Sequence, residues 1–383
     1  YFSLNPLTMR LALFLGMTIT IFNCNGLKNI DAKKANGPID LIVKNHANAL
    51  LADSKINAAS IGVYKNGKIA TGHFGELDKG KGNIPTDHSI YEIASVSKAF
   101  AGTLVAQAVL DKKLNLEDDI RQFLKGDYSN LDYEGNPIQV RHLITHTAGL
   151  PRFFPTRINA LFNNIDENLP FRIFEIEKAY SKQAFLEDLK SITIEVIPGT
   201  SYIYSNADVE LMAHILENVY QTSYEQLLQK FICDKAGMQK TRIHLSAEEQ
   251  VDLVNGYGET NNPVPHFANT LWGGGSGIKS TTSDLIRFIQ FQLESKNPSV
   301  QESHKILFEN NDMQTAYLWP VFNDPEDGTI YRIHGGAFGT QNFLLIVPKY
   351  NLGISIITNQ SGPETQGKLS NTLDNLLLDL KQL

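Results

Sequence analysis

Cysteine is scarce in this chain. Only Cys24 and Cys233 occur among its 383 residues, which excludes a disulfide framework and a cysteine-based metal site. Runs of one charge are also missing: 34 basic and 41 acidic residues are mixed along the chain, with a net charge of −7. We therefore expect no nucleic-acid-binding surface. The hydrophobic content of 42% is typical of a soluble globular protein with a sizeable core.

A long hydrophobic run is absent too. The apolar segment 11–22, which follows Arg10, is too short to span a bilayer as a helix. A basic residue before a short apolar core is typical of an export signal. We therefore expect a signal peptide or lipoprotein signal over 1–26, and a protein exported to the periplasm or cell envelope. Cys24 stands where a bacterial lipoprotein carries its lipid anchor; the alternative is a cleaved signal peptide with an incidental cysteine.

The sequence does contain a Ser-x-x-Lys motif at Ser95 and Lys98, followed by apolar residues at helical spacing. On a helix, residues three apart share a face, so the Lys98 ammonium would reach the Ser95 hydroxyl. A nucleophilic serine needs such a neighbouring base. The alternative is that Ser95 is an ordinary helix N-cap. A second Ser-x-x-Lys, Ser276 to Lys279, lies in a glycine-rich run and is expected to be a loop.

The rest of the pattern predicts a mixed α/β domain with an antiparallel sheet. Asn66-Gly67 between alternating apolar residues favours a hairpin with a two-residue turn. Helices are expected before this hairpin, after Ser95, after Asn206 and over 369–380. The other expected strands lie at 316–319, 330–333, 343–347 and 354–358.

A second polar group, Tyr204 and Asn206, follows a Pro-Gly turn signal and precedes an amphipathic helix. A tyrosine can relay protons where positive charge lies nearby, and asparagine both donates and accepts hydrogen bonds. Asn206 as a plain helix cap is the alternative. Another Tyr-x-Asn, Tyr128 to Asn130, lacks both the turn signal and the helix, so we expect no site there.

Two histidines and one aromatic segment complete the candidates. His142 and His146 lie near a helix end, where a histidine is more often a hydrogen-bonded structural residue than a base, and we expect that role for both. Segment 152–190 carries clustered aromatic residues without clear periodicity. It is either a lid or substrate wall, or a packed insertion.

With His334-Gly335-Gly336 added, these motifs resemble those of the serine beta-lactamase and penicillin-binding-protein superfamily. The likeness is greatest to its class C branch, which includes D-alanyl-D-alanine carboxypeptidases and esterases. The Ser95, Tyr204 and His334 motifs fit the first, second and third motifs of that family in order. Another His-x-Gly, beginning at His73, precedes Ser95 and is out of order.

The resemblance implies an α/β (α+β) fold of the beta-lactamase/transpeptidase type. An antiparallel sheet flanked by helices would be built from residues of about 45–115 and 268–383. A mostly helical subdomain, about 116–267, would lie over it, both within one hydrolase domain spanning 27–383. The site would lie between the two parts.

The resemblance also implies roles for individual residues. Ser95 would attack a carbonyl and become acylated, with Lys98 and Tyr204 sharing the role of general base. Asn206 would hold Lys98 and a polar group of the substrate. No metal or organic cofactor is expected.

On the opposite strand, His334 and Gly336 would line the site, and the N–H groups of Ser95 and Ala337 would form an oxyanion hole. Beta-lactamases carry Lys-Thr-Gly at this strand, whereas His334 is a weaker, pH-dependent cation for a substrate carboxylate. We therefore expect small esters or D-amino-acid peptides to be better substrates than beta-lactams. The alternative is a catalytically silent envelope protein of the same fold that binds peptidoglycan.

Overall fold

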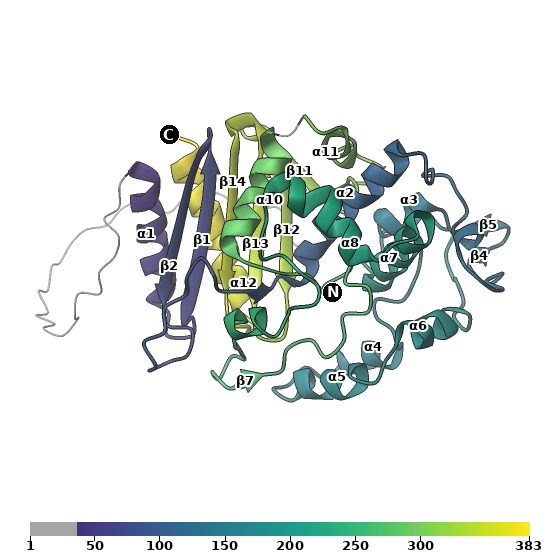
Figure 1. Cartoon of the computed structure of the whole chain (residues 1–383), viewed down its shortest axis with the longest axis horizontal. Helices are drawn as coiled ribbons and strands as arrows, with labels where there is room; N and C mark the ends of the chain where they lie inside the picture. Colours follow the sequence, from purple (N-terminus) through teal and green to yellow (C-terminus); the bar gives the residue numbers. More distant parts are fainter. Residues whose placement is uncertain (1–36, 295) are drawn as a thin grey trace, which may run out of the picture. The chain divides into compact units, whose positions relative to one another are not determined.

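An antiparallel sheet of eight strands runs through the part of the chain that the computed structural model describes, residues 37–294 and 296–383 (Figure 1). The expected signal segment 1–26, with Cys24, lies outside the described residues. Cys233 is buried as a free thiol. Within the described ranges, no helix has both the length and the apolar character needed to cross a membrane.

The strand order is β2-β1-β14-β13-β12-β11-β10-β9, so strands from the two ends of the described chain pair with each other. β1 and β2 form the expected hairpin, and its turn residues Asn66 and Gly67 have φ of 50° and 81°. Positive φ angles at both central residues are what a two-residue type I′ turn requires. The strands are β1 (Ala58–Lys65), β2 (Lys68–Gly75), β9 (Phe308–Glu309), β10 (Gln314–Thr315), β11 (Pro320–Asp324), β12 (Gly328–Gly336), β13 (Gln341–Val347) and β14 (Leu352–Thr358).

The expected strand over 316–319 is wrong. These four residues form a tight turn between β10 and β11, in which the Ala316 N–H donates to the Trp319 carbonyl (2.9 Å) and Leu318 has φ of 60°. All four side chains are buried. A short apolar run indicates burial but cannot by itself distinguish an extended backbone from a buried turn.

Helices cover both faces of the sheet (Figure 1). On one face, α1 (Pro38–Leu51) and α12 (Thr365–Leu380) pack on β1, β13 and β14. The leucines of the expected last helix are buried there, as its apolar stripe predicts. On the other face, α10 (Thr282–Glu294) contacts β1 and β14.

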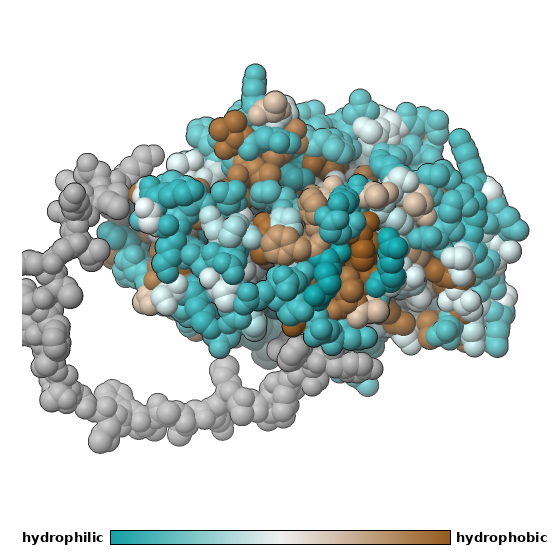
Figure 2. Space-filling view, turned by 90° about the horizontal axis from the view of Figure 1, so that it is seen from below, coloured by the Kyte–Doolittle hydropathy of each residue, from teal (hydrophilic) through white to brown (hydrophobic). Residues whose placement is uncertain are grey.

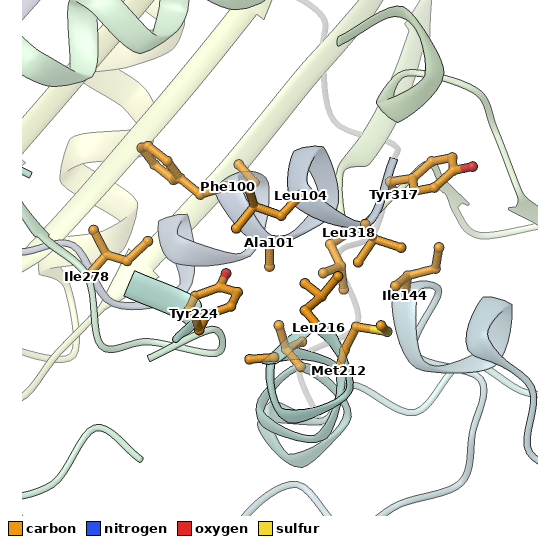
Figure 3. Close-up of a cluster of buried hydrophobic side chains, with 14 of the residues drawn as sticks. Phe100, Ala101, Leu104, Ile144, Met212, Leu216, Tyr224, Ile278, Tyr317 and Leu318 are labelled. Carbon is orange, nitrogen blue, oxygen red and sulfur yellow. The ribbon is translucent and has the colours of Figure 1, made fainter. Parts of the chain in front are cut away.

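The helix after Ser95, α2 (Ser97–Leu110), is buried on nearly all sides rather than amphipathic as expected. Alanine and glycine occupy its second face, so other elements approach it closely. Figure 3 shows Ala101 of α2 pointing toward Met212 and Leu216 of α7 (Asn206–Tyr220), while Phe100 points away from α7. The Phe100 ring stacks on Phe288 of α10. A helix that is buried all round lies inside a domain.

The remaining helices lie mostly between α2 and α10 in the chain. They are α3 (Val140–Ile144), α4 (Arg157–Leu161), α5 (Leu169–Glu177), α6 (Lys182–Leu189), α8 (Tyr224–Leu228), α9 (Asp234–Ala236) and α11 (Pro298–Ser303). Three short strand pairs join β3 (Tyr91–Glu92) to β8 (Lys279–Ser280), β4 (Asp132–Tyr133) to β5 (Asn136–Pro137), and β6 (Gly256–Tyr257) to β7 (Pro263–Val264). The β3–β8 pair ties the start of the Ser95 segment to the glycine-rich run.

Close packing on α2 gives a stability prediction. A Cβ on Gly102 would lie 1.9 Å from the Tyr317 carbonyl oxygen, so Gly102→Ala should lower the free energy of unfolding by about 1–3 kcal/mol, the usual cost of overpacking. A Cβ on Gly367, in α12, would have no neighbouring atom within 4 Å, so Gly367→Ala should instead raise it by up to about 1 kcal/mol. Denaturant unfolding of both variants tests this. A Gly102→Ala variant as stable as the wild type would contradict the packing described.

Candidate active site

Ser95 lies in a 3₁₀ turn, Ala94–Val96, directly before α2. Ala94 has φ of 46°, a left-handed conformation that is uncommon for a residue with a side chain. The turn leaves Ser95 partly exposed, while Lys98 enters the first turn of α2 and is buried. The Ser95 side chain does not cap α2; its hydroxyl contacts Lys98 and Tyr204 instead. The N-cap alternative for Ser95 is therefore wrong.

Tyr204 and Asn206 reach the same place from the start of α7. Ser205 is the N-cap of α7, and its Oγ accepts from the Asp208 N–H (3.1 Å) and donates to the Pro151 carbonyl (2.7 Å). This leaves the residues on either side free to face α2. The Tyr204 and Ser95 hydroxyl oxygens are 2.6 Å apart.

Lys98 is surrounded by three acceptors. Its Nζ donates to Asn206 Oδ1 (2.6 Å), to the Gly275 carbonyl (2.6 Å) and to Ser95 Oγ (3.2 Å). An ammonium group has three N–H donors, so each donor has a partner. The side chain is only 1% exposed, and these bonds offset the cost of burying its charge.

Glu210 supports this arrangement, and it was not identified from the sequence. Its carboxylate accepts from the backbone N–H groups of Trp272 (3.0 Å), Gly273 (3.1 Å) and Gly275 (2.8 Å). Burial raises the pKa of Glu210 to about 7, although these hydrogen bonds oppose the rise. Glu210 thereby fixes the loop whose carbonyl holds Lys98. The available signal was its position, four residues after Asn206 on one helix face.

His146 packs against Tyr204. Its ring centroid is 4.7 Å from that of Tyr204, and its Nδ1 is 3.1 Å from Oδ2 of Asp208. Burial raises the pKa of Asp208 well above its usual range and lowers that of His146 well below, so we assign a neutral pair. His142 has the structural role expected: its Nδ1 accepts from the Gln139 N–H at the start of α3.

His334 lies on β12 and is hydrogen-bonded to the neighbouring strand. Gln341 donates through its amide nitrogen to Ser361 (2.8 Å), so its oxygen accepts from His334 Nε2 (2.6 Å). Burial lowers the pKa of His334, which favours the neutral ring at pH 7. The Ala337 N–H donates to the Thr340 carbonyl (2.9 Å), so an oxyanion would have to share this donor in a bifurcated bond.

The alternative motifs form no second site. Lys279 Nζ donates to the Ile243 carbonyl (3.0 Å). Asn130 binds two backbone carbonyls, and Tyr128 Oη lies 3.4 Å from another. His73 bonds to Ser60 (2.9 Å), whose side chain is fully buried. Among residues 37–294 and 296–383, no cluster of three or more histidine, cysteine or acidic side chains could hold a metal ion.

Two cavities meet at Ser95. One, of about 390 Å³, is lined by Lys98 and His334, among others; we call it the His334 cavity. The other, of about 250 Å³, is lined by Asn206, Gly336 and Ala337 and by aromatic residues of 152–190; we call it the Asn206 cavity. Tyr204 lines both cavities. So does Arg152, which the sequence did not single out and whose guanidinium carbon lies 5.6 Å from the Tyr204 ring centroid.

Comparison with known proteins agrees with this geometry. The Beta-lactamase family model matches residues 43–379. A beta-lactamase from Pseudomonas fluorescens is 25% identical, over 85% of this chain and 94% of that protein. Protein flp from Staphylococcus aureus (strain MW2) is 28% identical, over 84% of this chain and 62% of protein flp.

A solved structure gives the same result for the fold. A beta-lactamase/D-alanine carboxypeptidase from Yersinia pestis superposes with a TM-score of 0.75 at 23% identity, covering 89% of this chain and 98% of that one. The resemblance and the fold class expected from the sequence are both confirmed. Because the family model spans most of its length, this chain belongs to the beta-lactamase family of serine hydrolases.

Proposed function

We propose that this protein cleaves ester or amide bonds through an acyl-enzyme on Ser95. The observation that carries the proposal is the position of the Ser95 hydroxyl, 2.6 Å from the Tyr204 oxygen and 3.2 Å from the Lys98 ammonium. A nucleophile, a proton acceptor and a cation within hydrogen-bond reach are what acyl transfer to serine needs. A protein that only binds peptidoglycan would have no use for this arrangement.

The proton transfers follow from the bonds of Lys98. Because all three of its N–H groups have acceptors, we propose that Lys98 stays an ammonium. We propose that Tyr204 reacts as a phenolate, and that its oxygen receives the Ser95 proton, becoming a phenol, as Ser95 Oγ bonds to the carbonyl carbon. Tyr204 then returns this proton to the departing alcohol or amine. Water then attacks the acyl-enzyme and gives its proton to the Tyr204 oxygen. Tyr204 returns this proton to Ser95 Oγ as the acyl group leaves, which frees Ser95.

Labelling tests this function. We expect a fluorophosphonate or a fluorescent penicillin to modify Ser95 alone. In the described chain, no other Ser-x-x-Lys motif has a hydrogen bond from its lysine ammonium to its serine hydroxyl; Lys279 donates to the Ile243 carbonyl instead. Peptide mass mapping of the adduct locates the label. An adduct on Ser276, or no adduct with either reagent, would favour the binding protein over the enzyme.

For substrate choice, we propose small neutral esters or D-amino-acid peptides ahead of beta-lactams. His334 supports the neutral esters in this proposal: its neutral ring, bonded to Gln341, attracts a substrate carboxylate less strongly than an ammonium would. We expect kcat/KM for p-nitrophenyl acetate to exceed that for a cephalosporin at pH 7–8. A cephalosporin turned over faster than the ester would contradict this, and would point to Arg152 as the carboxylate anchor. Export and a lipid anchor at Cys24 also stay proposals.

A further inference from the structure

The Asn206 cavity is walled by apolar side chains. They come from α4, α5 and α6, from the segments that flank α4, from the loop before the glycine-rich run, and from the turn between β12 and β13. Figure 2 views the side of the molecule where α4, α5 and β7 lie in Figure 1, and there hydrophobic surface is framed by hydrophilic surface. The aromatic residues of the wall are Phe153, Phe154, Phe162, Phe185, Phe267 and Phe338. Segment 152–190 is thus both a packed insertion and a cavity wall.

This cavity lies on the acyl side of Ser95. The leaving oxygen or nitrogen takes on negative charge before it is protonated, and the Lys98 ammonium, which would stabilise that charge, lines the His334 cavity but not the Asn206 cavity. Tyr204, which delivers the proton, lines both. An acyl chain on Ser95 therefore extends into the Asn206 cavity, where its walls remove apolar surface from water.

One carboxyl group stands among these apolar walls. Glu177, the last residue of α5, lines the cavity. Its Oε2 is buried and has no hydrogen-bond partner in the described structure. The charged groups that act on it are two further carboxylates, Glu92 and Glu210. Those two are partnered, Glu92 by the Phe267 N–H (2.8 Å) and Glu210 by three backbone N–H groups.

Glu177 is half-buried, and a carboxylate oxygen that is buried without a partner, as its Oε2 is, costs free energy because its lost hydration is not replaced. An ammonium would satisfy it best: it donates hydrogen bonds to the oxygens and lowers the repulsion among the three carboxylates. A purely apolar chain would not remove this free-energy cost, because it has no hydrogen-bond donor for the Glu177 carboxylate. We propose that the Asn206 cavity binds acyl chains that are apolar along their length and end in a primary amine, which pairs with Glu177. This inference rests on the proposed function, since it concerns the acyl group carried by Ser95.

The test compares matched acyl esters. The p-nitrophenyl esters of 4-(aminomethyl)benzoic, 4-(aminomethyl)phenylacetic and 3-[4-(aminomethyl)phenyl]propanoic acids each have an isosteric 4-ethyl partner, and the aromatic spacer prevents cyclisation. Burial, together with the charges of Glu92 and Glu210, raises the pKa of Glu177 to about 7, so the assays are run at pH 8, where its carboxylate is charged in the wild type. For the best-fitting length, the amine-to-ethyl ratio of kcat/KM should fall about 10- to 100-fold in Glu177→Gln, the scale of a charge-assisted hydrogen bond. Glu177→Leu should lower it at least as far.

Control variants distinguish failure of the amine subsite from failure of the proposed hydrolase function. Glu175 is exposed on the same helix and paired with Lys178, so Glu175→Gln should keep the wild-type ratio. A ratio within each protein does not depend on how much of that protein is folded. If p-nitrophenyl acetate is cleaved but the ratio is equal in wild type and Glu177→Gln at all three lengths, the amine subsite is refuted and the hydrolase stands. If no ester is cleaved, or Ser95→Ala cleaves them as fast, the proposed function itself fails and the subsite with it.

Discussion

Replacing Lys98 with alanine should lower kcat/KM for ester hydrolysis by at least about 10²-fold, the usual scale for losing one group that stabilises charge in the transition state. The substitution removes the cation 3.2 Å from the nucleophile and leaves Asn206 Oδ1 and the Gly275 carbonyl without their donor. Steady-state kinetics and the thermal midpoint should be measured on the same preparations, so that loss of activity is separated from loss of fold.

The matched control for this substitution is Lys113→Ala. Lys113 follows α2 in the chain and is exposed, and it should keep wild-type turnover. A Lys98→Ala protein that is folded and within about fivefold of wild-type activity would show that the buried ammonium is structural, and the proton route through Tyr204 would need no cation beside it.

Tyr204→Phe should also lower kcat/KM by about 10²-fold or more while leaving the fold intact. The phenol oxygen is the atom 2.6 Å from Ser95 Oγ, and phenylalanine removes it without changing the ring that packs against His146. The effect should be larger on esters with poor leaving groups, because Tyr204 also returns the proton to the departing group. Rates for phenyl and p-nitrophenyl esters of one acid measure this difference.

Tyr128→Phe is the control, because Tyr128 is the other tyrosine of a Tyr-x-Asn pattern. Its hydroxyl is 3.4 Å from the Leu186 carbonyl and does not line either cavity at Ser95, so its removal should leave turnover unchanged. Near-wild-type activity in Tyr204→Phe would mean that Lys98 alone takes the serine proton. That result would overturn the assignment of Lys98 as a permanent cation.

The parts of the site that could be predicted from the sequence are those encoded by local spacing. Ser95 and Lys98 are three residues apart and Tyr204 and Asn206 are two apart, so each pair is placed by its own turn and helix start. The two pairs lie close together only because α2 packs against α7. The spacing of residues within either motif does not predict that packing. The resemblance to a family supplied that step.

Other parts could not be predicted, for identifiable physical reasons. The Gly275 carbonyl that binds Lys98 is a backbone atom, and a sequence carries no signal for where a carbonyl points. Glu177 and Arg152 belong to a segment of irregular aromatic pattern, whose fold is decided by tertiary contacts. The strand predicted over 316–319 is wrong because an apolar run indicates burial, and burial does not require an extended backbone. In the fold, the β1–β2 hairpin was predictable from its Asn-Gly turn, and the last helix from an apolar stripe that matches its buried face.

The pairing of β1 with β14 has a consequence for how the molecule forms during synthesis. Thr358 donates a hydrogen bond to the Ala58 carbonyl 300 positions earlier in the chain, between the second and third strands of the sheet. Contacts so distant in sequence carry a large loop-closure entropy and are made late in folding. During translation Ser95 is synthesised long before β13 and β14. For most of translation, the nascent chain therefore contains the nucleophile but lacks strands that the complete sheet needs. Acylation by the labelling reagents above should therefore begin only when almost the whole chain has emerged.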